Sequence, residues 1–116
     1  MIIHFLHGFL GFASDWDIFK NDFYPNKTIF YSIEDFLKKE NKEKNDLKAF
    51  AENFNNYVFS QDKAKEKNIL IGYSLGGRLA LHCLAEENNH WDAAIIISAN
   101  LGLVDEQEKI LRIKNE

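Results

Sequence analysis

The chain has 116 residues, of which 46% are hydrophobic and 28% are charged, with 14 basic residues against 18 acidic ones and a formal net charge of −4. This composition predicts one globular domain, and it excludes a disordered chain, a strongly basic nucleic-acid-binding surface and a segment long enough to span a bilayer. The single cysteine, Cys83, cannot form an internal disulfide, and the apolar start lacks a basic leader region, so we expect a cytoplasmic protein.

Short apolar runs alternate with helical patterns along the chain. The first half begins with a strand at 1–6 and a glycine-punctuated loop at 7–11. A short helix follows that carries Trp16, Phe19 and Phe23, is capped by Ser14 or Asp15 and is broken by Pro25. A strand at 28–32 and a solvated charged loop at 38–48 complete this half. The second half begins with a longer helix capped by Asp46, which has an apolar stripe at helical spacing formed by Leu47, Phe50, Phe54, Tyr57 and Val58. A strand at 68–73, a helix at 75–87, a strand at 93–98 and a last amphipathic helix at 105–114 follow.

This alternation predicts a fold of the α/β class. Right-handed crossovers between the strands would build a mostly parallel sheet between two helical layers, which is a three-layer αβα arrangement. Sites in such sheets form at the carboxyl ends of the strands, where His7, Ser74 and Ser98 lie. We expect His4, which lies inside the first strand, to be a satisfied core residue.

The segment around Ser74 carries the strongest functional signal. Gly72, Ser74 and Gly76 form a G-x-S-x-G pattern between an apolar strand and a helical pattern. That context is typical of a nucleophile elbow, in which a strained turn lifts the serine hydroxyl above the sheet. The free N–H groups at the start of the following helix would stabilise an anion beside the serine. The alternative is an ordinary serine in a strand-to-helix turn.

Three stretches resemble the α/β-hydrolase-fold family, and within it the 2-succinyl-6-hydroxy-2,4-cyclohexadiene-1-carboxylate synthases of menaquinone biosynthesis. They are residues 6–11 with Asp15-Trp16, residues 72–81 and residues 97–103. The resemblance extends over nearly the whole chain but only over the N-terminal half of the family's length. It implies a partial α/β-hydrolase fold in a single domain, 1–116, without the lid and without the C-terminal half that carries the catalytic Asp and His.

The resemblance also implies roles for individual residues. Ser74 would be the catalytic serine, and the backbone N–H groups of Phe9 and Leu75 would form the oxyanion hole. The substrate-binding residues would be Arg78, which holds a carboxylate, together with Tyr73 and His7. The family reaction is an elimination in which the serine acts as a base, the oxyanion is held by the two N–H groups, and pyruvate leaves.

Two features depart from the family. A serine needs a histidine and an acid behind it, and the positions of His4, His82 and His90 do not suit that role, which leaves His7 as the alternative base. The segment 32–36 also differs from the glycine- and histidine-containing loop that the family commonly carries there.

Several readings of function therefore stay open. The first is the synthase-like enzyme, acting on a small-molecule carboxylate. The alternatives are a serine esterase or thioesterase of the same fold, and a non-catalytic, truncated chain that binds a partner or a small acid. No metal site or cofactor is expected, because the histidines lack cysteine or acidic partners at ligand spacing. An open sheet edge would favour a homodimer.

Overall fold

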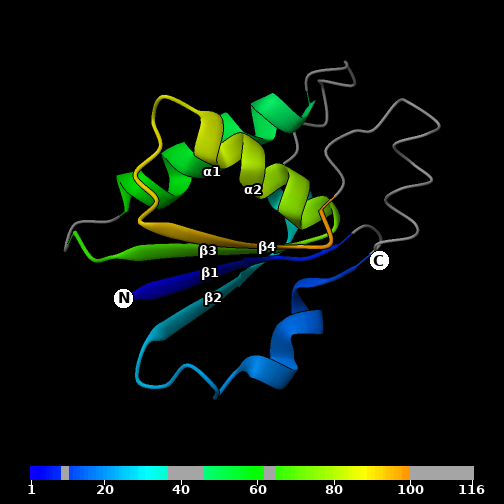
Figure 1. Cartoon of the computed structure of the whole chain (residues 1–116), viewed down its shortest axis with the longest axis vertical. Coiled ribbons are helices and arrows are strands. Elements are labelled where there is room, and N and C mark those ends of the chain that lie inside the picture. The colour runs from blue at the N-terminus through cyan, green and yellow to red at the C-terminus, as the bar shows by residue number, and fades with distance from the viewer. Residues whose placement is uncertain (9–10, 37–45, 62–64, 100–116) are drawn as a thin grey trace.

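The computed structural model describes residues 1–8, 11–36, 46–61 and 65–99 (Figure 1). Their elements are, in chain order, β1 (Ile2–Leu6), the 3₁₀ helix η1 (Ala13–Phe19), β2 (Lys27–Tyr31), the 3₁₀ helix η2 (Ile33–Phe36), α1 (Asp46–Ser60), β3 (Asn68–Tyr73), α2 (Leu75–Ala85) and β4 (Ala93–Ile97). All four predicted strands are confirmed to within a residue or two, and so are the two longer helices. The helix predicted at 105–114 and most of the charged loop at 38–48 lie outside the described residues.

The four strands form one parallel sheet in the order β2-β1-β3-β4. Figure 1 shows α1 and α2 side by side on one face of this sheet and η1 on the opposite face. The α/β arrangement is therefore confirmed, although the two outer layers are unequal among the described residues. The two central strands, β1 and β3, end next to each other, since Leu6 pairs with Gly72.

The first helix differs from the prediction. It is a 3₁₀ helix that ends at Phe19 and does not extend to Phe23. Its N-cap is Phe12, whose N–H donates to the Asp15 carboxylate at 2.9 Å, so Asp15 closes the first turn from inside the helix and is not its cap. Trp16 is the only buried residue of η1. One buried side chain does not provide the apolar stripe that sustains a longer amphipathic α-helix.

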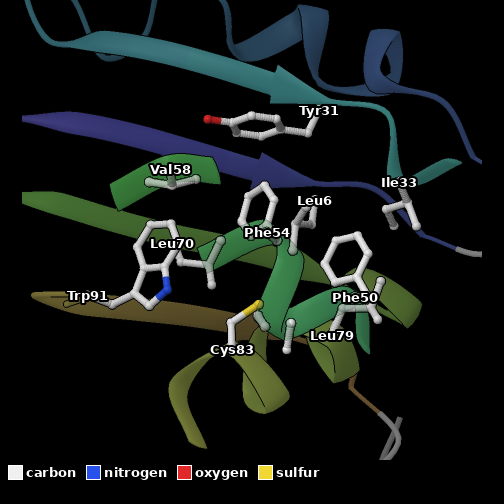
Figure 2. Close-up of a cluster of buried hydrophobic side chains, with 12 residues drawn as sticks. Leu6, Tyr31, Ile33, Phe50, Phe54, Val58, Leu70, Leu79, Cys83 and Trp91 are labelled. Atoms are coloured by element: carbon white, nitrogen blue, oxygen red, sulfur yellow. The ribbon is translucent and has the colours of Figure 1, made fainter. Parts of the chain in front are cut away.

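The larger core lies between the sheet and the two α-helices. Its side chains come from the strands, from α1 and from α2, and Figure 2 shows them pointing toward one another. The fully or almost fully buried members include Leu6, Leu70, Phe50, Phe54 and Leu79. The apolar stripe predicted on α1 is therefore confirmed, except that Tyr57 stays 44% exposed.

A smaller core lies on the opposite face, where η1 packs against β1 and β2. Ile3, Phe5, Trp16 and Ile71 are buried there. Because the side chains of a strand alternate between faces, a strand that is apolar throughout can contribute to both cores. β1 does so, and this is why the first strand reads as a nearly continuous apolar run.

His4 is the polar exception within β1. Its Nε2–H donates to Asn68 Oδ1 at 2.8 Å, and its Nδ1 accepts from the Tyr31 hydroxyl at 2.7 Å. The proton is assigned to Nε2 because the amide oxygen of Asn68 can only accept a hydrogen bond. The ring is also stacked on Tyr31. The prediction that His4 is a satisfied core residue is confirmed; it lies in the middle of β1, opposite Leu70.

We predict that the folded protein loses stability in alkaline solution, because the Cys83 thiol and the Tyr31 hydroxyl are buried. Burial raises the pKa of the Cys83 thiol far above its ordinary value of 9.0, and burial likewise raises the pKa of the Tyr31 hydroxyl above 10.0. Above pH 9 the unfolded chain therefore binds fewer protons than the folded one, and the free energy of unfolding falls by about 1.4 kcal/mol per pH unit for each ionised group. This stability is fully present below pH 9.

Urea unfolding at a series of pH values should show this decline. In the Cys83→Ala variant the first part of the decline is absent, and the fall begins near the ordinary pKa of the tyrosine. A free energy of unfolding that starts to fall at the same pH in both proteins would contradict the assignment to Cys83.

Candidate active site

Ser74 lies between the end of β3 and the start of α2 in a strained backbone conformation. Its φ is 55° and its ψ is −113°. Such a conformation costs a non-glycine residue about 1–3 kcal/mol and persists only where the surroundings hold it. Here the Ser74 N–H donates to the Ile97 carbonyl at 2.8 Å, and the Ser74 carbonyl accepts from the Arg78 N–H at 3.0 Å. These two hydrogen bonds thus connect the turn to the end of β4 and to the first turn of α2.

The flanking glycines allow this turn to pack against the central strand. A Cβ atom on Gly76 would overlap the backbone carbonyl groups of Leu6 and His7, at the end of β1. A Cβ atom on Gly72 would overlap the Gly76 carbonyl and lie 2.8 Å from the Gly77 nitrogen. The first turn of α2 therefore packs directly against the backbone at the ends of β1 and β3, and positions 72 and 76 have no room for a side chain.

The loop after β1 passes close to the serine. A Cβ atom on Gly8 would lie 2.9 Å from Tyr73 Cδ2 and 3.5 Å from Ser74 Cβ. Of the two predicted oxyanion-hole residues, Leu75 is the first residue of α2, where backbone N–H groups have no partner within the helix. Phe9, the other one, lies outside the described residues.

His7 is buried at the same edge, with 6% of its surface exposed. Its Nδ1–H donates to the Gly8 carbonyl at 2.9 Å, and its Nε2 accepts from the Ile33 N–H at 3.1 Å. These two bonds fix the tautomer and tie the loop after β1 to the segment after β2. Both ring nitrogens are used by the backbone, so neither is available to take a proton from Ser74.

A cavity of about 380 Å³ opens beside the elbow. It is lined by residues of η1, of the elbow, of the end of β4 and of the loop after β1. The lining residues are His7, Gly8, Gly11, Asp15, Trp16, Phe19, Tyr73 and Ile97. The predicted residues Tyr73 and His7 are thus brought together. The residues of η1 and Ile97 were missed, although the Asp15-Trp16 pair already belonged to one of the three resembling stretches.

Arg78 begins the second turn of α2 and is partly exposed. It does not belong to the lining of the cavity, and no described side chain forms an ion pair with it. Its guanidinium is therefore not committed to another described acidic group.

No described histidine forms a hydrogen bond with the serine hydroxyl. His82 is exposed near the end of α2, and His90 is exposed in the segment before β4. The part of the chain that the structure describes also contains no group of three or more His, Cys, Asp or Glu side chains that could hold a metal ion. Nor does that part include a helix with the length and apolarity needed to cross a membrane.

No family model matches the chain. A Haemophilus influenzae protein, provisionally named 2-succinyl-6-hydroxy-2,4-cyclohexadiene-1-carboxylate synthase, is 32% identical over 120 residues, which cover 98% of this chain and 47% of that protein. The chain thus spans about half the length of the curated relative that it matches.

Two solved structures have a similar fold. MenH from S. aureus matches with a TM-score of 0.67 and 21% identity, over 96% of this chain and 42% of that one. An extracellular α/β-hydrolase from a Paenibacillus species matches with a TM-score of 0.63 and 16% identity, over 89% of this chain and 42% of that one. The chain therefore has a partial α/β-hydrolase fold and, over nearly its whole length, resembles the 2-succinyl-6-hydroxy-2,4-cyclohexadiene-1-carboxylate synthases.

Proposed function

We propose that this chain forms the nucleophile-bearing half of an α/β-hydrolase-fold enzyme that acts on a small carboxylate, most like the menaquinone-pathway synthase. The observation that carries the proposal is the conformation of Ser74, which is held at positive φ between a central strand and a helix. Strain of this kind collects at functional sites, where it keeps a side chain in a working orientation. A cytoplasmic location is part of the same proposal.

In this proposal the serine acts as the base in an elimination. Once a base has taken the hydroxyl proton of Ser74, the serine oxygen takes a proton from a carbon beside a carbonyl group, and the electron pair of the broken C–H bond moves onto the carbonyl oxygen. The N–H groups of Phe9 and Leu75 stabilise that oxyanion, and one such donor is worth about 3–4 kcal/mol in known enzymes. Collapse of the oxyanion then expels pyruvate.

Three further residues would hold the substrate. The Arg78 guanidinium is suited to a carboxylate because it offers two parallel N–H donors. Tyr73 and His7 line the cavity beside the elbow. We assign Tyr73 a direct contact with substrate and His7 a positioning role, because both nitrogens of its ring are bonded to the backbone.

The proposal requires a base for Ser74. The loss of a triad member lowers turnover by about 10³–10⁶-fold in serine enzymes. Since no described histidine forms a hydrogen bond with Ser74, we expect the 116-residue chain by itself to turn over slowly even if the serine is reactive. The same observation favours the second candidate, a chain that binds a small acid without transforming it.

Covalent labelling of Ser74 distinguishes these two candidates. A fluorophosphonate probe should add one phosphonyl group per chain, and the Ser74→Ala variant should abolish the labelling, as read by intact-mass spectrometry. Ser98→Ala is the matched control, because Ser98 also lies at the carboxyl end of a strand with a positive φ of 52°. That variant should keep full labelling.

Absence of labelling at prolonged exposure would reject the catalytic proposal and leave the binding function. Labelling that survives in Ser74→Ala would assign the reactivity to another residue. If Ser74 is labelled, release of pyruvate, as opposed to hydrolysis of simple esters and thioesters, separates the synthase-like activity from a general esterase.

A further inference from the structure

The cavity beside the elbow contains one carboxylate. Asp15 belongs to its lining, and the other large side chains there are mostly apolar or aromatic, namely Trp16, Phe19, Tyr73 and Ile97. Within the described part of the chain, neither a lysine nor an arginine belongs to this lining. The cavity thus combines an apolar wall with a negative charge.

The Asp15 carboxylate is held in place by the loop after β1. Its Oδ2 accepts a hydrogen bond from the Phe12 N–H at 2.9 Å. A Cβ atom on Gly11 would lie 2.6 Å from the same oxygen, so the carboxylate packs directly against the Gly11 backbone. The Gly11 N–H in turn donates to the Gly8 carbonyl at 2.9 Å. The charge therefore stays at the cavity wall, because the side chain cannot rotate away without losing its bond to Phe12.

No described group neutralises this charge. Asp15 forms no ion pair with any basic side chain that the structure describes. His7, which also lines the cavity, donates through Nδ1 and accepts through Nε2, so its ring is in a neutral form. A ligand in the cavity would therefore experience the field of an uncompensated carboxylate.

We propose that Asp15 determines which part of the substrate enters the cavity, by excluding a carboxylate and admitting an uncharged, largely apolar group. The inference rests on the proposed function, which assigns the cavity to the substrate. In a cavity of about 380 Å³, a ligand carboxylate would lie within the Debye length of Asp15, about 8 Å at physiological salt, so salt would screen the repulsion only in part. The carboxylate would also lose hydration without gaining a cation.

This assignment predicts how the substrate is oriented. Arg78, the proposed partner of the substrate carboxylate, lies one helical turn after Ser74 and outside the lining of the cavity. Gly8 and Tyr73, by contrast, belong to the lining and lie next to the serine. The substrate would thus place its carboxylate toward α2 and its uncharged part toward η1, with the reacting carbon between them at Ser74.

Benzamide and benzoate test the role of Asp15, because they have nearly the same size and shape and differ in charge. Each is titrated into the isotope-labelled 116-residue chain, and binding is followed by the NMR amide signals of Gly8 and Gly11, which line the cavity. We expect benzamide to bind more tightly. Asp15→Asn should reduce that preference by about three- to tenfold, mainly by tightening the binding of benzoate. Asparagine keeps an oxygen that can accept from the Phe12 N–H, so the fold of η1 is preserved.

Asp17→Asn is the matched control. Asp17 also lies on η1 and is exposed, but it does not belong to the described lining, and its substitution changes the net charge of the chain by the same amount. That variant should keep the preference of the native chain. A preference that changes equally in both variants would overturn the proposal, because the effect would then come from net charge. Equal affinity of the native chain for the two ligands, or no binding of benzamide at millimolar concentrations, would also overturn it.

Labelling of Ser74 by the fluorophosphonate separates this inference from the proposed function. A reactive serine together with a preference that does not depend on Asp15 would overturn the role of Asp15 alone. An unreactive serine together with a preference that Asp15→Asn reduces would reject catalysis, and it would support Asp15 as the residue that selects the ligand by charge.

Discussion

Gly76→Ala is expected to destabilise the fold by about 3 kcal/mol or more, a large part of the 5–15 kcal/mol that holds a domain of this size together. The added methyl group would overlap the carbonyl groups of Leu6 and His7. These atoms are backbone at the end of a central strand, so they cannot rotate away as a side chain can. The better helix propensity of alanine, about 1 kcal/mol, opposes the loss but is smaller. Urea unfolding measures the difference.

Gly77→Ala is the matched control, since it makes the same substitution one residue further along α2. Its methyl group would lie 2.9 Å from Ala99 Cβ, 3.1 Å from Ile96 Cγ2 and 3.3 Å from the Gly72 carbonyl oxygen. We expect a smaller loss of roughly 1 kcal/mol, because the nearest atom would lie 2.9 Å away, whereas at Gly76 the nearest atom, a backbone carbonyl oxygen, would lie much closer. Equal losses at Gly76 and Gly77 would show that the contact with the end of β1 is not what requires glycine at position 76.

Asn55→Ala is expected to cost about 3 kcal/mol of unfolding free energy. Asn55 is fully buried in α1. Its Nδ2 donates to the Cys83 carbonyl at 2.8 Å and to Asn88 Oδ1 at 3.1 Å, and its Oδ1 accepts from the Trp91 Nε1–H at 2.9 Å. Alanine would leave a buried indole N–H and a buried carbonyl without partners, and each such group costs about 1–3 kcal/mol.

Asn56→Ala tests whether burial accounts for that cost. Asn56 is the next residue on α1 and also bonds to Asn88, through its Oδ1 at 2.7 Å, but it is exposed to water. Water can replace the lost partner, so we expect a change within about 0.5 kcal/mol. A loss at Asn56 as large as that at Asn55 would mean that the segment after α2 is held mainly by Asn88. Guanidinium unfolding of both variants decides between the two explanations.

Local patterns in the sequence determined the elements and the elbow. The four strands are runs of apolar residues, and the apolar stripe of α1 recurs at helical spacing, so both are visible within a window of a few residues. The context of Ser74 is equally local, because the strand, the glycines and the helix lie within eighteen consecutive residues of the chain, 68–85. The resemblance to the α/β-hydrolase fold rested on this segment and on two other short ones, residues 6–11 with Asp15-Trp16 and residues 97–103.

The extent of η1 depended on contacts that no local pattern contains. The spacing of Trp16, Phe19 and Phe23 was consistent with a helix up to Phe23. In the folded chain only Trp16 is buried within η1, so the helix stops at Phe19. Phe23 instead packs beside Phe5 of β1 from outside the helix.

The sequence by itself thus determined the fold class, the order of the elements and the position of the serine, because hydrophobic periodicity and glycine placement act over short distances. Only the tertiary structure decided that the two ring nitrogens of His7 are taken up by backbone groups at Gly8 and Ile33, and that Asn55 joins α1 to the end of α2. It also decided that one face of β4 stays exposed. Burial and hydrogen bonding are set by residues that are distant in the chain and meet only when the sheet forms.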